Sequence, residues 1–279
     1  MYHSDQELRD LGSHFPFGEN WSDFSETIDK EKIEEARSSI ARLLGSHSLT
    51  GRTFLDVGSG SGIHSLAALS MGCSRVLAID LDPQSVATTE ATLEAYSRSS
   101  DWDCSHISVF ELDPAEHGTF DIVYSWGVLH HTGAMYKAIR KCATMVGHGG
   151  LLAIALYRKT PLCGFWRWEK RLYKNSSPRT QQLLRSSYIG AFRLACMATG
   201  RDFRTYVREY KQNRGMSFDH DVHDWMGGYP YESITRDEAT RFVEALKFDS
   251  VRSFTKSPGL GLFGSGNDEY VFRRNSSLN

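Results

Sequence analysis

A glycine-rich turn between a short apolar run and an amphipathic segment restricts what this chain can fold into. Residues 52–57 (RTFLDV) are mostly apolar and stop at glycines, and the pattern becomes helical from residue 63 onward. The segment predicts a strand, a tight turn and a helix, in that order. Glycines at positions 58, 60 and 62 would let a ligand approach backbone N–H groups at the start of the helix.

Strands and helices are predicted to alternate through residues 53–157. Apolar runs at 75–79, 106–110, 120–124 and 151–157 indicate further strands, and helical patterns cover 27–44, 83–96 and 135–145. Thr235 and Glu238 form a capping box that opens another helix, and late strands are expected near 250–255 and 269–273. The alternation predicts an α/β fold with a doubly wound, mostly parallel seven-stranded sheet.

The strand rhythm is lost between residues 158 and 231, where Arg, Lys and aromatic residues are frequent. We interpret this stretch as a helical insertion before the last two strands. A length of 279 residues fits one α/β domain with such an insertion. The predicted organisation is a helical cap (1–50), a ligand-binding core (51–157), the insertion (158–231), and a helix with the final antiparallel strands (232–279).

The spacing of the glycines and the positions of two acidic residues indicate the chemical class of the ligand. A dinucleotide-binding turn needs G-x-G-x-x-G, and the third glycine here comes one position early. Asp56, just before the turn, would repel a pyrophosphate. Asp80 follows about 20 residues later, where a carboxylate can accept both hydroxyls of a ribose. The sequence therefore favours an adenosine-type ligand with a cationic tail and no phosphates.

Four motifs in order, LDVGSGSG, AIDLDP, DIVYSWGVLHHTG and GGLLAIALY, resemble class I S-adenosylmethionine-dependent methyltransferases, and the bacterial small-molecule, benzoquinol-methylase-like subgroup in particular. The resemblance implies a Rossmann-like enzyme that binds S-adenosylmethionine and releases S-adenosylhomocysteine. It implies cofactor-binding roles for Asp56, Gly58, Ser59, Gly60, Gly62, Asp80, Leu81, Ser125, Trp126 and Trp21. Glu111 and Asp113 are alternatives for the adenine amino group. Trp21 belongs to an aromatic segment (15–21) expected either to fold over the cofactor or simply to pack.

Methyl transfer is an in-line displacement, so the enzyme must position the acceptor and remove its proton. We predict a His general base, with His131, His220 and His223 as candidates. Relatives build the acceptor pocket in an insertion before the last helix, so residues 158–231 are expected to bind the acceptor. Structural, surface and metal-binding roles are the alternatives for these histidines, and we predict no metal. Methylation of oxygen is favoured over nitrogen.

A formal net charge of -2 provides no overall attraction to nucleic acid, and YSWG replaces the [N/D]-P-P-[Y/F/W] segment of base-nitrogen methyltransferases. We therefore predict a small-molecule acceptor, with an anionic acceptor as one option for the basic insertion. A macromolecular acceptor and a non-catalytic cofactor-binding protein are the alternatives. The polar N-terminus and the absence of a long apolar run predict a cytoplasmic protein without a membrane partner. The five scattered cysteines are expected to be reduced.

Overall fold

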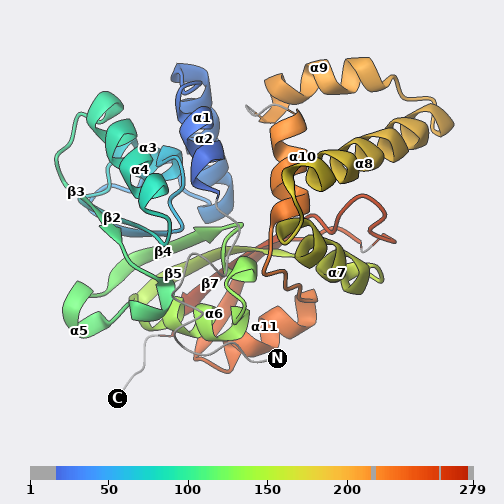
Figure 1. Ribbon diagram of the computed structural model, residues 1–279. Coiled ribbons are helices and arrows are strands. Elements are labelled where there is room, and N and C mark those ends of the chain that lie inside the picture. Colours follow the sequence, from blue (N-terminus) through green and yellow to red (C-terminus); the bar gives the residue numbers. More distant parts are fainter. Residues whose placement is uncertain (1–16, 215–217, 258, 276–279) are drawn as a thin grey trace.

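One mixed sheet organises the molecule in the computed structural model, which describes residues 17–214, 218–257 and 259–275. The strand order is β3-β2-β1-β4-β5-β7-β6 (Figure 1). Strands β1 to β5 are parallel, and β7 runs antiparallel to both of its neighbours. The strands are β1 (Thr53–Val57), β2 (Arg75–Asp80), β3 (Trp102–His106), β4 (Phe120–Trp126), β5 (Val146–Tyr157), β6 (Phe248–Phe254) and β7 (Asn267–Arg274). The predicted seven-stranded fold is confirmed.

Two apolar cores lie on opposite faces of the sheet, because successive residues of a strand point to opposite sides. On β1, Phe54 packs with α2 and α3, whereas Leu55 and Val57 pack with α6 and α11. These helices cover the two faces in Figure 1. Their bounds are α2 (Lys30–Leu44), α3 (Ile63–Ser70), α6 (Met135–Thr144) and α11 (Arg236–Glu244); α4 (Pro83–Tyr96) contacts α1 and α3.

The third strand differs from the prediction. Residues 106–110 were expected to form it, but β3 ends at His106, and Val109–Glu111 form a short 3-10 helix that Ser108 caps. The strand lies at the edge of the sheet and is half exposed along its length. An edge strand needs no continuous apolar run, so the apolar residues that follow it were misleading.

The N-terminal cap contains two helices where the sequence predicted one. Helix α2 begins after Asp29, whose side chain accepts a hydrogen bond from Lys32 N. An additional helix, α1 (Gly18–Ser25), forms within the aromatic segment. Residues 15 and 16 of that segment lie outside the described residues. Outside the cap, the short helix α5 (Pro114–His117) follows the 3-10 helix formed by Val109–Glu111.

The insertion consists of four helices in the described residues, α7 (Cys163–Lys174), α8 (Pro178–Ala198), α9 (Phe203–Arg214) and α10 (Phe218–Gly227). They pack around their own apolar cluster, which includes Tyr173, Phe218 and Val222. Figure 1 shows them together on one side of the sheet, away from α3 and α4. In the described chain, no helix combines the length and apolar character that crossing a bilayer requires.

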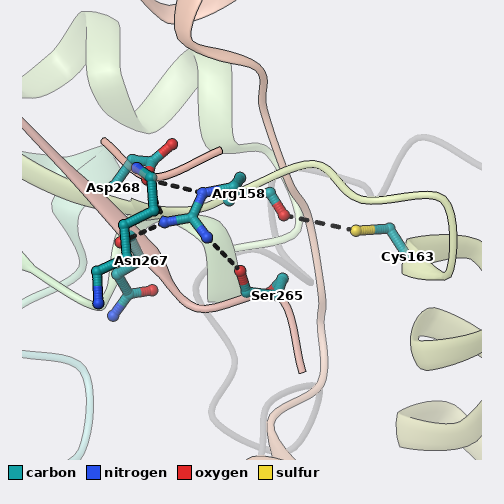
Figure 2. A network of polar contacts seen from close by, with 6 residues as sticks. Arg158, Cys163, Ser265, Asn267 and Asp268 are labelled. Carbon is teal, nitrogen blue, oxygen red and sulfur yellow. Dashed lines mark hydrogen bonds and ion pairs between the residues drawn. The ribbon is translucent and has the colours of Figure 1, made fainter. Parts of the chain in front are cut away.

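The two ends of the insertion are fastened to each other and to the sheet. Arg158 and Ile234 form a parallel β-bridge, and Ile234 N donates to Tyr157 O at 3.0 Å. Figure 2 shows the Arg158 guanidinium directed at Asp268 of β7, with Nε and Nη2 at 2.8 and 2.5 Å from Oδ1. Cys163 follows at the start of α7, its Sγ 3.6 Å from Arg158 O. The entry and exit points of the insertion are therefore fixed by the sheet.

Candidate active site

The glycine loop is closely covered by other side chains. Gly58 and Gly60 have φ angles of 77° and 55°, in the left-handed region that favours glycine. A Cβ on Gly58 would lie 2.4 Å from Val128 Cγ2, and one on Gly60 would lie 3.0 Å from the Trp21 indole. Both positions therefore need glycine for conformation and for space, and Trp21 lies directly against the predicted cofactor loop.

Two acidic residues flank this loop at the carboxyl ends of neighbouring strands. Asp56 on β1 is buried and accepts a 2.7 Å hydrogen bond from Ser65 Oγ, while burial raises its pKa to about 7. Asp80 at the end of β2 accepts from Gly60 N at 3.1 Å and from Asp82 N at 2.9 Å. Burial raises the pKa of Asp80 to about 6. The contacts favour a loop-ordering role for Asp56 and hold the Asp80 carboxylate beside the loop.

The other predicted cofactor residues also have partners within the protein. Ser125 Oγ donates to Val57 O at 2.9 Å, and Ser59 Oγ lies 2.9 Å from Thr89 Oγ1. The partly exposed Trp126 donates through Nε1 to Glu269 at 2.9 Å. Leu81 O is 2.9 Å from His106 Nε2. The Ser125 hydroxyl proton is therefore used within the protein.

Both candidates for the adenine amino group cap short helices. Glu111 accepts from Ser108 N at 2.9 Å, and Asp113 accepts from Ala115 N at 2.8 Å. Both residues are exposed. Each carboxylate is therefore engaged in capping its own short helix.

Helix α1 touches the glycine loop and the insertion at once. Gly18 N donates to Asp82 Oδ2 at 3.0 Å, close to the Trp21 contact with Gly60. On the other side, the Asn20 amide donates to Asp224 on α10, and the Phe17 ring lies 5.4 Å from the ring of His131. Asp82 was missed as a site residue. Its sequence signal, Asp before Pro83, is that of a helix N-cap, which it also provides for α4.

The two histidines after β4 occupy different environments. His130 is fully buried, its Nδ1 accepts from Tyr157 N at 3.2 Å, and burial holds its pKa well below the ordinary value. His131 is half-buried, with Nδ1 2.8 Å from Pro230 O. Because a carbonyl oxygen only accepts, Nδ1 carries a proton, and in the neutral ring the lone pair then lies on Nε2. Nε2 is therefore the nitrogen through which a neutral His131 would act as a base.

The segment GGYPYE (227–232) forms a wall against His131. A Cβ on Gly228 would lie 2.7 Å from His131 Cε1, and a cis peptide bond joins Tyr229 to Pro230. Glu232 N donates to His130 O at 2.9 Å, and Glu232 Oε2 accepts from Met135 N at 2.8 Å. The segment is thus held to the histidine turn and to the first residue of α6.

The remaining candidate bases lie on α10. His223 Nδ1 is 2.6 Å from the Tyr173 hydroxyl on α7. The backbone of His220 lies in the same helix, and its side chain is outside what the structure describes. His131, by contrast, lies against Phe17, the residue that precedes α1. No group of three or more His, Cys, Asp or Glu residues in the described chain is arranged to hold a metal.

A buried cation lies among aromatic rings beside this wall. Lys170 on α7 is fully buried, donates to Trp225 O and has Nζ 3.5 Å from the Trp225 ring centroid. Burial lowers its pKa to about 7. The neighbouring Glu169 is also buried, and its carboxylate oxygens have no hydrogen-bond partner in the described structure. The sequence had placed Lys170 within a basic aromatic run without indicating burial.

Asp224 is expected to make stability fall as pH rises. Burial, and next the charge of Asp221, raise its pKa from 3.8 to about 8 in the folded protein. The folded state therefore binds this proton more tightly, and the contribution present below pH 4 is lost as pH rises through about 8. Asp224→Asn should flatten this dependence in thermal unfolding between about pH 4 and pH 9. Exposed Asp219→Asn on α10 is the control; an unchanged slope in Asp224→Asn would contradict the assignment.

Comparisons with known proteins agree with this arrangement. Residues 55–154 match a family model described as a methyltransferase domain. A ubiquinone biosynthesis O-methyltransferase from Xanthomonas campestris pv. campestris (strain B100) is 35% identical over 113 residues, covering 40% of this chain and 46% of that protein. The chain therefore aligns with less than half the length of this relative.

Two solved structures share the fold across most of this chain. A magnesium protoporphyrin IX methyltransferase from Synechocystis PCC 6803 with bound SAH has a TM-score of 0.51 and 14% identity, covering 87% of this chain and 83% of that one. PKMT2 from Rickettsia typhi in complex with AdoHcy has a TM-score of 0.58 and 12% identity, covering 88% and 54%. At these identities the likeness concerns the fold.

The sheet order, the glycine loop and these similarities identify a class I S-adenosylmethionine-dependent methyltransferase fold. Within this fold, residues 55–154 are the part that matches the methyltransferase domain model. The predicted resemblance is confirmed at the level of the class I methyltransferases, while the benzoquinol-methylase-like subgroup stays a prediction.

Proposed function

We propose that this protein transfers the methyl group of S-adenosylmethionine to an oxygen of a small-molecule acceptor, with His131 as the general base. The observation that carries the proposal is the hydrogen bond from His131 Nδ1 to Pro230 O, which leaves the basic lone pair on Nε2. His131 also packs against Phe17, the N-cap residue of α1, and Trp21 of α1 lies on the glycine loop. The candidate base and the candidate cofactor loop therefore both contact the same N-terminal segment.

The residues at the loop fit the proposed cofactor. The left-handed glycines permit close approach to backbone, and the hydrogen bonds from Gly60 N and Asp82 N hold the Asp80 carboxylate beside the loop, which supports its proposed contact with a ribose diol. When bound, S-adenosylmethionine supplies an electrophilic methyl group on a sulfonium. In this scheme Asp80 binds the ribose, Asp56 orders the loop through Ser65, and Trp21 excludes water from above Gly60.

His131 acts on the acceptor in this scheme. Its Nε2 takes the hydroxyl proton while the acceptor oxygen attacks the methyl group in line with the departing sulfur. Gly228 and Pro230 keep the imidazole in place from the acceptor side. The name of the Xanthomonas relative, an O-methyltransferase, supports oxygen as the acceptor atom. His220 and His223 are retained as residues of the proposed acceptor-binding insertion.

Calorimetric titration with S-adenosylmethionine and S-adenosylhomocysteine tests the cofactor assignment. A screen of phenols, carboxylic acids, sugars and amines for release of S-adenosylhomocysteine then tests the acceptor class. We expect micromolar binding of both compounds and turnover on a hydroxyl acceptor. Absence of binding would overturn the enzyme assignment, whereas turnover on amines alone would overturn O-methylation and leave the cofactor site intact.

A further inference from the structure

The part of the insertion that holds α7, α8 and α9 carries a strong positive charge, although the whole chain is nearly neutral. Of the 32 Lys and Arg residues, 14 lie between residues 158 and 214, whereas 3 of the 34 Asp and Glu residues do. This segment therefore has a formal charge of +11, and the rest of the chain has -13. Such an asymmetry creates a local positive field even though the whole molecule is nearly neutral.

Helix α7 exposes apolar side chains among these charges. Phe165, Trp168 and Leu172 are 49%, 60% and 41% exposed. Their spacing of three and four residues places them on one side of the helix. Its other side is buried, where Trp166 and Tyr173 pack into the insertion and the sheet.

Helix α8 repeats the pattern. Leu183, Leu194 and Met197 are 66%, 67% and 66% exposed. Eleven residues are close to three helical turns, so Leu183 and Leu194 share a face with Met197. The opposite side of α8 packs Tyr188 and Phe192 into the insertion core. Helix α8 thus has an apolar side that packing within the insertion leaves exposed to solvent.

Exposed arginines stand next to these apolar residues. Arg171 precedes Leu172 on α7, and Arg193 precedes Leu194 on α8. Apolar side chains interspersed with arginines are the pattern of helices that lie at a bilayer surface. The anionic headgroups of such a surface attract basic side chains within about a Debye length.

We propose, in place of the prediction from sequence that the protein has no membrane partner, that α7 and α8 dock the protein onto an anionic lipid surface. The apolar side chains of both helices enter the boundary between headgroups and acyl chains, while the neighbouring arginines bind lipid phosphates. RNA would meet the same charge, but four of the six exposed apolar residues are not aromatic: Leu172, Leu183, Leu194 and Met197. Aliphatic groups gain from entering a bilayer, whereas single-stranded nucleic acid is bound by aromatic stacking. The proposal is independent of the methyl-transfer chemistry.

Vesicle co-sedimentation of the full chain tests this docking. We expect binding to vesicles of phosphatidylcholine and phosphatidylglycerol in roughly equal amounts, little binding to phosphatidylcholine alone, and release as NaCl rises from about 0.05 M to about 0.5 M. Two double variants separate the apolar from the electrostatic contribution to vesicle binding. Leu183→Gln with Leu194→Gln removes apolar side chains, and Arg171→Glu with Arg193→Glu reverses charges. Each should weaken binding by about tenfold or more.

Matched controls change the same chemistry elsewhere on the surface. Val251→Gln removes an exposed apolar residue of β6. Arg98→Glu with Arg241→Glu reverses two exposed charges outside the insertion. Both controls should bind vesicles like the wild type. Because all these positions are exposed, the thermal unfolding midpoints should agree, which separates lost binding from misfolding.

Tryptophan fluorescence gives a second measurement. Trp168 should move to shorter emission wavelength when anionic vesicles are added, and Trp168→Phe should remove that shift while keeping vesicle binding. Equal vesicle binding by the Leu183→Gln, Leu194→Gln variant and the wild type would overturn the proposal. Binding to single-stranded RNA without binding to anionic vesicles would also overturn it and assign the basic surface to nucleic acid.

Discussion

His131→Ala is expected to lower kcat by roughly 100- to 10,000-fold, the range that a positioned general base contributes. The affinity for S-adenosylmethionine should change little, because the imidazole is hydrogen-bonded to Pro230 rather than to the glycine loop. The pH–rate profile should lose the limb that reports deprotonation of the base. Calorimetry and single-turnover rates with bound cofactor provide the two measurements.

His223→Ala is the matched control, because that imidazole is engaged by the Tyr173 hydroxyl on α7. It should reduce turnover much less than His131→Ala. If His131→Ala weakened cofactor binding while turnover per bound cofactor stayed unchanged, the base assignment would be wrong. If His223→Ala gave the larger loss of kcat, the base would have to be placed on α10.

Asp80→Ala is expected to raise the Kd for S-adenosylmethionine by roughly 5- to 150-fold, which corresponds to about 1–3 kcal/mol for polar groups left without a partner. The ribose hydroxyls lose their acceptor, and so do Gly60 N and Asp82 N. Titration calorimetry gives the Kd directly. Asp103→Ala, which changes an exposed acid on β3, should leave the Kd unchanged.

Asp80→Asn refines this prediction. The amide oxygen can still accept one backbone N–H, but the side chain lacks the charge and the second acceptor that a diol uses. Its Kd should therefore lie between those of the wild type and Asp80→Ala. An unchanged Kd in Asp80→Ala would remove Asp80 from the cofactor site.

Local patterns were sufficient to predict the central sheet and the glycine loop. The apolar runs that became β1, β2, β4 and β5 are buried on both faces, so burial and hydropathy agree there. Thr235 caps α11 as its spacing to Glu238 predicted. In each case the residues that determine the structure are close together in the sequence.

The parts of the site that were missed depend on contacts between distant residues. Asn20 and Asp224 are 204 residues apart, and neither α1 nor its role as a bridge has a local signal. On α7, hydropathy even misleads about burial, since Lys170 is fully buried while Trp168 is 60% exposed. That inversion arises because Trp225 and Tyr231 surround the Lys170 ammonium.

Because the two ends of the insertion lie next to each other, the insertion could be exchanged for another segment. Arg158 and Ile234 meet at a single β-bridge, and the Asp268 carboxylate anchors the arginine from the neighbouring strand. A replacement for residues 159–233 needs two ends that meet at this bridge, and it must also restore the contacts of Asp224 with Asn20 and of Pro230 with His131. The register of β5 with β7 is set outside the replaced segment. If the insertion binds the acceptor, as proposed, exchanging the segment should change acceptor preference while S-adenosylmethionine affinity stays the same. The residues that would determine acceptor specificity then form one continuous piece of chain.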